Sequence, residues 1–377
     1  MPRETSGPNN ATVDNVDSGR ASDKIVLVTG INGYIATHIG LQLLEKGYRV
    51  RGTSRSASAG DHLVAGAFRG YDAGRYEHHV VPDMTAPGAF DDAVRGVHAI
   101  IHTASPVDFT LRSVDAFFGP AVGGNLSILE SARTAAGPQL TCFVVTSSIA
   151  AIVDRWRLPP THAYTESDWN ESGEAVARAD FSAPVAYGAS KAAAERALWD
   201  WRAANRPRFA VAAINPAVVT GPPVSWPQHP EALNTTLLPI WRIYSGTTPE
   251  GTIPPPIGGA GYIDVRDVAR MHVWAAEHPA ESDGQRYILS NGKAPPQAAA
   301  DLLREAFPDR DIVVGEPGKG YRSDYWFPED EASTVATKAY RALGVERFIP
   351  YDRSILDTVA AFEKQWPGLA QNFKHKN

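Results

Sequence analysis

Tyr187 and Lys191 form a pair of side chains whose types and spacing predict acid-base chemistry. Of the 13 tyrosines, only Tyr187 has a lysine four positions later, and the Ala-rich segment that it opens is expected to be helical through Trp201. Residues four apart share one face of a helix. Because a neighbouring ammonium lowers the pKa of a phenol, we expect Tyr187 to exchange a proton with a carbonyl oxygen. A surface Tyr-Lys pair on an amphipathic helix is the alternative.

A serine is the next candidate for this chemistry. Thr146-Ser147-Ser148 stands at the end of a predicted strand that begins at Leu140. The carboxyl ends of parallel strands are where ligands bind in α/β sheets. We therefore expect the Ser148 hydroxyl, in preference to that of Ser147, to hydrogen-bond a substrate carbonyl. A hydroxyl that caps a loop is the alternative.

Residues 29–36 (TGINGYIA) have the spacing of a dinucleotide-binding turn between a strand and a helix. Gly30 allows the tight turn, Gly33 lets the backbone approach a pyrophosphate, and the small Ala36 lets the helix pack closely on the strand. The N-terminus of the helix would then receive the phosphates. The alternative is an ordinary strand-to-helix turn. The predicted cofactor contacts of this motif are Gly30, Asn32, Gly33, Tyr34 and Ile35.

The end of the second predicted strand indicates which dinucleotide would bind. Residues 49–58 read RVRGTSRSAS and contain no acidic residue to hold a free ribose 2'-hydroxyl. Arg51 and Arg55 could instead pair with a 2'-phosphate through charge-assisted hydrogen bonds. We therefore expect NADPH as the cofactor, with Arg55 as the preferred contact. Arginines that only solvate the end of a strand are the alternative.

The elements that must position these residues alternate between short β-branched runs and longer helical stretches. Segments apolar on both faces indicate a parallel sheet covered by helices on each side. The predicted strands are 25–30, 48–54, 76–82, 97–104, 140–148, 208–216 and 286–290, and the predicted helices include 34–46, 265–277, 296–306, 333–342 and 353–365. Residues 222–260 hold nine of the 29 prolines together with Trp226, Trp241 and Tyr244, which is typical of a lid or a substrate-facing region.

The composition excludes several other classes of protein. With 377 residues, of which 43% are hydrophobic, the chain can form a full-sized core. Its formal charge of -6 is spread along the chain without a Lys/Arg block, so neither nucleic acid nor a membrane surface is an expected partner. Cys142 is the one cysteine, which rules out an intrachain disulfide. We expect no metal site, because no Cys/His cluster has metal-ligand spacing.

The first residues of the chain are polar and contain no apolar run that could serve as a signal peptide or a membrane span. We expect residues 1–22 to be a disordered tail and the protein to be cytoplasmic. The predicted domains are a cofactor-binding domain over 23–221, to which segments near 262–292 return, and a mainly substrate-binding domain with its lid over 222–377.

From about Lys24 to Val273 the sequence resembles the extended short-chain dehydrogenase/reductases. The resemblance is to the branch that contains dihydroflavonol reductases, cinnamoyl-CoA reductases and fungal NADPH-dependent aldehyde and ketone reductases. The matching pieces are VTGINGYIATHI, YRVRGTSRS, HTASPV, VVTSSIAAIV, ESDWN, YGASK, INPAVVTGP and YIDVRDVA. The resemblance implies an α/β fold, a Rossmann-type doubly wound parallel sheet with a smaller C-terminal substrate-binding α/β region.

The resemblance also implies roles for individual residues. The catalytic trio would be Ser148, Tyr187 and Lys191, of which Tyr187 and Lys191 would also contact the cofactor. Beside the cofactor would lie Thr103, Ala104, Ser105 and Pro106, with Asp83 and Met84 at the adenine and Pro216, Val218 and Val219 at the nicotinamide. The predicted substrate pocket contains Pro106, Phe109, Ile152, Trp226 and Trp241, although core packing explains such apolar side chains equally well. Asn125 lies at a shifted position relative to the asparagine of many family members, and we assign it no role.

The reaction implied is the NADPH-dependent reduction of an apolar or aromatic aldehyde or ketone to the alcohol, with Tyr187 as proton donor. A nucleotide-sugar epimerase or dehydratase would use the same fold and the same Tyr-Lys pair, but such enzymes generally retain NAD and favour an acidic residue where Arg51 to Arg55 stand. A non-catalytic NADP(H)-sensing protein is the other alternative. We expect a small-molecule carbonyl substrate and a monomer or homodimer.

Overall fold

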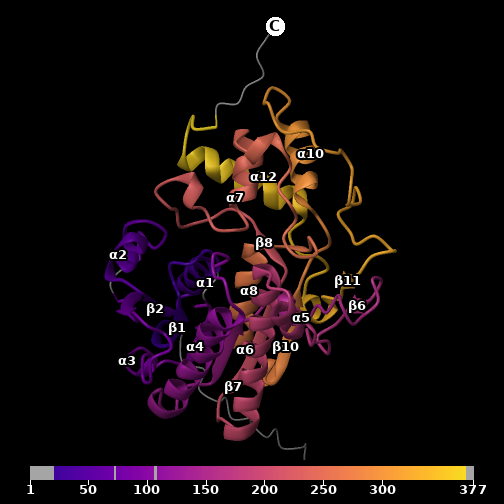
Figure 1. The fold of residues 1–377 in the computed structure, drawn as a ribbon. Helices are drawn as coiled ribbons and strands as arrows, with labels where there is room; N and C mark the ends of the chain where they lie inside the picture. Colours follow the sequence, from indigo (N-terminus) through magenta and orange to yellow (C-terminus); the bar gives the residue numbers. More distant parts are fainter. Residues whose placement is uncertain (1–20, 72–73, 106–107, 371–377) are drawn as a thin grey trace, which may run out of the picture.

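The computed structural model describes residues 21–71, 74–105 and 108–370. Its central sheet has seven parallel strands in the order β10-β7-β5-β4-β1-β2-β3 (Figure 1). The strands are β1 (Ile25–Thr29), β2 (Arg49–Ser54), β3 (Tyr76–Val80), β4 (Ala99–His102), β5 (Cys142–Thr146), β7 (Ala210–Pro216) and β10 (Gln285–Leu289). The strand order reverses between β1 and β4, which creates a crevice at the carboxyl ends of these strands where ligands bind in such sheets. The expected Rossmann-type parallel sheet is confirmed.

The strands are apolar at consecutive positions because both faces of the sheet are covered. In β1, Val26 and Val28 pack on one face and Leu27 packs on the other. The first face is covered by α1 and α8, and the second by α3, α4 and α6. The helices around the sheet are α1 (Tyr34–Glu45), α2 (Ala57–Ala65), α3 (Asp91–Val94), α4 (Val114–Ala135), α5 (Gly173–Ala179), α6 (Ala183–Asn205), α8 (Val265–Glu277), α9 (Pro279–Ser282) and α11 (Thr337–Leu343).

Helix α6 positions the predicted Tyr-Lys pair, and local sequence explains where it begins and ends. Ser182 precedes it in an extended conformation, and a proline stands in its first turn, where no backbone N–H bond is lost. The helix ends at Asn205, and the residue that caps it, Arg206, has a left-handed φ of 45°. The buried side of α6 consists largely of small residues, so α6 packs closely against α4. Its long polar side chains on this side are therefore held in a confined space.

A smaller group of helices packs around a core of its own. These are α7 (Leu238–Ser245), α10 (Pro296–Ala306) and α12 (Tyr351–Gln365), and Figure 1 shows them together at the top of the view. Two short parallel sheets lie outside the central sheet: β8 (Val218–Thr220) with β9 (Tyr262–Asp264), and β6 (Ala163–Tyr164) with β11 (Ser333–Thr334). The helix predicted over 333–342 is wrong at its start, because Ser333 and Thr334 pair with β6 and the helix begins only at Thr337.

The short 3-10 turns of the chain are η1 (Ala21–Asp23), η2 (Ile149–Ala151), η3 (Pro230–Ala232) and η4 (Pro249–Gly251). The predicted lid segment, 222–260, contains α7 as well as η3 and η4. Of the predicted tail, residues 1–20 lie outside the described residues. None of the helices in the described part of the chain has the length and apolar character needed to cross a membrane.

Candidate active site

The structure brings Ser148, Tyr187 and Lys191 together beside the end of β5. Tyr187 and Lys191 project from the same face of α6, and the Tyr187 phenol is hydrogen-bonded to the Ser148 side chain. Lys191 Nζ lies 5.8 Å from the centre of the Tyr187 ring and donates a hydrogen bond of 2.9 Å to Ser105 Oγ. Ser105 comes from the segment that follows β4. The contact of Lys191 with Ser105 gives no signal in the sequence, because 86 positions separate the two residues.

Burial decides the protonation of this group. It raises the pKa of Tyr187 above its ordinary value, and the hydrogen bond from Ser148 offsets only part of this effect. The expected lowering of the Tyr187 pKa by Lys191 is therefore wrong for this structure. Burial also lowers the pKa of Lys191 to about 8, and the charge of Glu195 opposes that effect. At neutral pH, Tyr187 carries a proton that it can donate, and Lys191 carries one that leaves more readily than from an ordinary lysine.

The glycine turn has the backbone geometry that a dinucleotide phosphate requires. Gly30 has a φ of 63°, and a Cβ there would lie 3.1 Å from Ala104 Cα, so the loops after β1 and β4 are in close contact. Gly33 precedes α1, whose first turn has neither a side-chain cap nor an acidic residue. The backbone N–H groups of that turn and the positive end of the helix dipole favour an anion. The residues present therefore fit a pyrophosphate.

A threonine hydroxyl joins the ends of β1 and β4. Thr29 Oγ1 accepts hydrogen bonds of 3.1 Å from the backbone N–H groups of both Thr103 and Ala104, and it lies 2.8 Å from His102 Nδ1. With two N–H donors already directed at this oxygen, the hydroxyl proton is directed toward His102. The predicted cofactor residues Thr103 and Ala104 are thus fixed against the glycine turn.

The other predicted contacts of the glycine motif differ in what their side chains do. Tyr34 donates a hydrogen bond of 2.7 Å to the carbonyl of Gly221, which follows β8, so its phenol holds two loops together. His38, one turn further along α1, lies 2.9 Å from the Pro222 carbonyl. The Asn32 side chain is exposed and that of Ile35 is half-buried. These side chains contribute to the shape of the turn, and its phosphate contacts would come from the backbone.

The two arginines that could bind a 2'-phosphate, Arg51 and Arg55, differ in burial and in their contacts. Arg51 is buried, and its guanidinium binds Glu77 at 2.5 Å and the carbonyls of Ala93 and Arg95 at 2.8 and 2.6 Å. Contacts within the fold therefore occupy the Arg51 guanidinium, and the predicted contact of Arg51 with a 2'-phosphate is wrong. Arg55 follows the end of β2 and is exposed. Among the described residues, no hydrogen bond or ion pair occupies the Arg55 guanidinium, so this cation is available to a phosphate.

The predicted adenine residues follow β3. Asp83 is fully exposed and accepts hydrogen bonds from the Thr85 backbone N–H and hydroxyl at 2.8 and 2.7 Å, which lower the pKa of its carboxyl. The terminal methyl of Met84 fills the space that a Cβ on Gly124 would need, so Met84 lies against α4. The nicotinamide candidates Pro216, Val218 and Val219 lie at the end of β7 and in β8. All these residues follow or end parallel strands.

Of the predicted pocket residues, Phe109 lies beside the reactive group. Its ring centre is 5.4 Å from that of Tyr187, at an angle of 54° between the rings. Ile152 is fully buried in the main core. Trp226 and Trp241 pack against Trp366, with ring centres at 5.2 and 5.5 Å, in the core formed by α7, α10 and α12. Both tryptophans therefore contribute to this core, as the alternative of core packing expects.

Pro106 and Asn125 are the remaining residues that the sequence singled out. Pro106 lies outside the described residues. Asn125 is buried in α4 and donates a hydrogen bond of 3.1 Å to the carbonyl of Ala194 in α6, so it helps to fix the helix that carries Tyr187. Burial lowers the pKa of the neighbouring His102 to about 3, with a further contribution from Lys191, and this imidazole is neutral.

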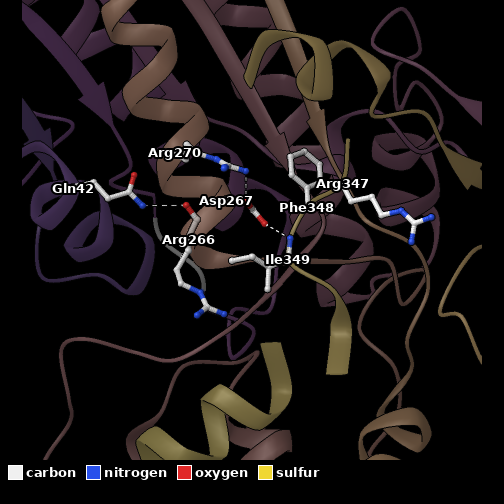
Figure 2. A pocket seen from close by; sticks show the side chains of 7 residues that line it. All are labelled: Gln42, Arg266, Asp267, Arg270, Arg347, Phe348 and Ile349. Atoms are coloured by element: carbon white, nitrogen blue, oxygen red, sulfur yellow. Dashed lines mark hydrogen bonds and ion pairs between the residues drawn. The ribbon is translucent and has the colours of Figure 1, made fainter. Parts of the chain in front are cut away.

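A cavity of about 370 Å³ lies elsewhere, between α1, α8 and the segment before α12 (Figure 2). Its polar groups are largely paired with one another. Arg270 binds Asp267 at 2.6 Å, Asp267 accepts the Ile349 N–H at 2.7 Å, and Gln42 donates to the Arg266 carbonyl at 3.1 Å. None of the three predicted catalytic residues lines it. This cavity therefore has no part in the candidate chemistry.

A smaller cavity of about 50 Å³ includes Val218, which is one of the nicotinamide candidates. Most of its walls are apolar and come from α7, the segment before β9, and the beginning of α10. Its lining residues include Val218, Pro239, Ile240, Ile243, Ile257 and Tyr262.

Within residues 21–71, 74–105 and 108–370, no group of three or more His, Cys, Asp or Glu side chains could hold a metal ion.

Several known proteins are similar to this chain in sequence. The family described as "NAD dependent epimerase/dehydratase family" matches residues 26–290. The NADPH-dependent methylglyoxal reductase GRE2 of Saccharomyces cerevisiae is 35% identical over 306 residues, which are 78% of this chain and 86% of that protein. Aldehyde reductase 2 of Sporidiobolus salmonicolor is 32% identical over 319 residues, or 82% of this chain and 88% of that protein.

Solved structures show the same similarity. Gre2 from Candida albicans in complex with NADPH superposes with a TM-score of 0.79 at 31% sequence identity, over 91% of this chain and 99% of that one. Yeast methylglyoxal/isovaleraldehyde reductase Gre2 in complex with NADPH gives a TM-score of 0.78 over 90% of this chain and 98% of that one. The chain belongs to the NAD dependent epimerase/dehydratase family, that is, to the extended short-chain dehydrogenase/reductases.

Proposed function

We propose that this protein uses NADPH to reduce an aldehyde or a ketone to the alcohol. The observation that carries the proposal is the buried group of Ser148, Tyr187 and Lys191, in which a protonated phenol is hydrogen-bonded to a serine next to a lysine of lowered pKa. Both named relatives are reductases, and one is NADPH-dependent by name, which supports the same class of reaction.

The chain's own residues would prepare the carbonyl for reduction. NADPH, when bound, would supply the hydride. Tyr187 would donate its proton to the carbonyl oxygen, and Ser148 would donate a hydrogen bond to the same oxygen. Lys191 would then return a proton to Tyr187 and would hold the nicotinamide ribose. Gly30, Gly33 and the first turn of α1 would hold the pyrophosphate, with Thr103, Ala104, Ser105 and residues 216–219 around the rest of the cofactor.

The substrate class follows from the side chains around this group. Phe109 offers an aromatic face next to Tyr187. Val218, one of the nicotinamide candidates, lines a mostly apolar cavity of about 50 Å³, which none of the three catalytic candidates lines. These features support an apolar or aromatic carbonyl compound as the substrate.

Loss of NADPH absorbance with a panel of aryl ketones, aliphatic aldehydes, β-ketoesters and dihydroflavonols tests the proposal. Turnover that requires Tyr187 supports it, and NADPH binding without any turnover would favour a sugar-nucleotide enzyme or a sensor.

The cellular setting is a further part of the proposal. Cys142 is buried as a free thiol, and burial raises its pKa to about 12, so the thiol stays protonated and unreactive. A reducing compartment such as the cytoplasm suits this protein. We expect the protein to act there as a monomer or a homodimer. Cell fractionation and sedimentation of the purified protein test these two statements separately.

The Arg55→Ala variant is expected to lose affinity for NADPH by about ten-fold to a hundred-fold, because one hydrogen bond to a charged group contributes roughly 1.5 to 3 kcal/mol. Affinity for NADH, which lacks the 2'-phosphate, should stay unchanged. Cofactor fluorescence titration measures both dissociation constants. Arg69→Ala is the matched control, since Arg69 is also exposed and its loss changes the net charge equally. An equal loss for NADPH and NADH would contradict the assignment of Arg55 to the phosphate.

In the direction of reduction, kcat/KM is expected to fall as the pH rises through about 8, where Lys191 loses its proton. Because the Lys191 pKa is lowered by burial, the ammonium form is complete only below this value and is lost above it. A pH profile at saturating NADPH measures the effect. Circular dichroism over the same pH range controls for unfolding. A rate that stays constant up to about pH 10, the ordinary range of a lysine, would contradict this role.

A further inference from the structure

Glu195 lies one turn of α6 beyond Lys191, on the helix face that carries Tyr187 and Lys191. The three residues are spaced at four and eight positions, so their side chains form one row along the helix. Glu195 is only 1% exposed. A carboxylate so deeply buried requires several partners, since an unpaired buried charge is very costly. Neither the predicted catalytic trio nor the predicted cofactor contacts include it.

Four donors surround the Glu195 carboxylate. Ser147 Oγ donates to it at 2.5 Å, Asn215 Nδ2 at 2.7 Å, Arg286 Nε at 2.5 Å and Trp199 Nε1 at 3.2 Å. Three of these donors come from separate strand segments: the end of β5, β7 and β10. One carboxylate thus connects the reactive helix to three neighbouring segments of the central sheet.

The contacts of Asn215 extend this connection to the reactive serine. Asn215 Nδ2 donates to Glu195 and also, at 3.1 Å, to the backbone carbonyl of Ser148. The residue before Ser148 is held in addition, because Ser147 binds Glu195 through its hydroxyl and the Ile214 carbonyl through its backbone N–H. The position of the Ser148 backbone therefore depends on the carboxylate in α6.

Arg286 is the charged partner of Glu195, and its side chain is 8% exposed. Its Nη1 donates to the carbonyls of Glu166 and Asp168 at 2.8 and 2.7 Å, and its guanidinium lies 3.7 Å from the centre of the Trp169 ring. These contacts hold the 166–169 loop against the sheet. The cation is fixed on the side of Glu195 that faces β10.

The groups around Lys191 come from three elements. Tyr187 and Glu195 lie on its own helix, the neutral His102 ends β4, and the Ser105 hydroxyl accepts from Nζ. Burial disfavours the ammonium form, and Glu195 is the negative charge that opposes this effect. Arg286 forms an ion pair of 2.5 Å with Glu195 and therefore compensates part of its negative charge. Removal of Glu195 and removal of Arg286 must therefore change the field at Lys191 in opposite directions.

We propose that Glu195 is a positioning residue for carbonyl reduction: its buried carboxylate lies one helical turn beyond Lys191 on the same face of α6 and fixes Ser148 through Asn215. This inference rests on the proposed function, because the charged Lys191 matters only where Tyr187 must be reprotonated. It does not require any contact between Glu195 and the substrate or the cofactor.

Two single variants test the inference through the direction of a shift. Glu195→Gln is expected to move the alkaline limb of the kcat/KM profile to lower pH by about 1 unit, because Lys191 loses the charge that favours its ammonium form. Arg286→Met is expected to move the same limb to higher pH, because Ser147, Asn215 and Trp199 still hold the carboxylate. Both variants lose the same ion pair, so both should lower the melting temperature.

A purely structural role predicts a different result. It would lower the stability of both variants and leave the alkaline limb in place, or move it in the same direction in both, and either result would overturn the inference. Arg286→Lys is the conservative control: it keeps the cation and should keep the limb near its wild-type position. An NMR titration of the Lys191 Nζ in the cofactor-free protein does not depend on turnover. The Lys191 pKa that it measures should shift in the same two directions.

The inference and the proposed function fail in distinguishable ways. If the wild-type protein reduces no carbonyl compound, the proposed function fails, while the NMR titration still reports on Glu195 and Lys191. If the wild-type protein is active and its rate depends on Tyr187, but the two variants do not shift in opposite directions, only the inference about Glu195 fails.

Discussion

Tyr187→Phe is expected to lower kcat by roughly 10² to 10⁴-fold, the range that a positioned general acid contributes. The variant removes one hydroxyl and keeps the aromatic ring, so the contact with Phe109 should remain. The Ser148 hydroxyl remains and can polarise a carbonyl. It donates its proton less readily than a phenol next to Lys191. Affinity for NADPH should stay near that of the wild type, because the glycine turn and Arg55 are untouched.

The control for this experiment is another buried tyrosine. Tyr76 lies in β3, and its hydroxyl has no hydrogen-bond partner among the described residues. Tyr76→Phe therefore makes the same chemical change at little cost to stability. Stopped-flow measurement of NADPH oxidation and fluorescence titration of NADPH should be applied to both variants. Retained turnover in Tyr187→Phe, or an equal loss in Tyr76→Phe, would refute the assignment of Tyr187 as the proton donor.

Asp264→Ala is expected to lower the free energy of unfolding by about 3 kcal/mol, the lower end of the range for breaking a buried ion pair. Asp264 is fully buried, and it binds Arg266 through two hydrogen bonds of 2.8 Å. Its side chain also accepts the Arg266 backbone N–H at 2.9 Å, which caps α8. The lower end applies because Arg266 is 29% exposed and keeps its second partner, Asp357.

Asp357 supplies the matched control, because it binds the same guanidinium at 2.7 Å from a more exposed position. Asp357→Ala should cost about 1 kcal/mol or less, as expected of a partly exposed pair. Urea unfolding followed by tryptophan fluorescence measures both variants. If Asp264→Ala lost less stability than Asp357→Ala, burial of the carboxylate could not be what makes the Asp264 pair the stronger one.

Much of the fold could be predicted because short-range patterns determine it. Consecutive apolar residues such as those of β1 are compatible with a strand buried on both faces, and all seven strands of the central sheet overlap the predicted segments. The start of α11 could not be predicted, because Ser333 forms a strand only where β6 offers a partner. Pairing between distant segments leaves no local pattern in so short a strand.

The candidate site divides in the same way. The spacing of Tyr187 and Lys191 and the glycines of the turn after β1 specify local geometry directly. The pKa of Tyr187 was expected to fall and rises instead, because it depends on how much water the fold removes from the phenol. The two tryptophans of the predicted lid turn inward for a comparable reason: α12 provides Phe362 and Trp366 as partners. Burial and packing depend on elements that are distant in the chain.

The sequence by itself determined the order of strands and helices, the dinucleotide turn and the Tyr-Lys pair, because each depends on backbone sterics or on the repeat of a single helix. Only the tertiary structure decided which charged side chains are paired within the fold and which are exposed to a ligand. It commits Arg51 to Glu77 and leaves Arg55 exposed, and it surrounds Glu195 with donors from α6, the end of β5, β7 and β10. The physical reason is that electrostatic interactions and burial act through space, between residues that the chain itself keeps far apart.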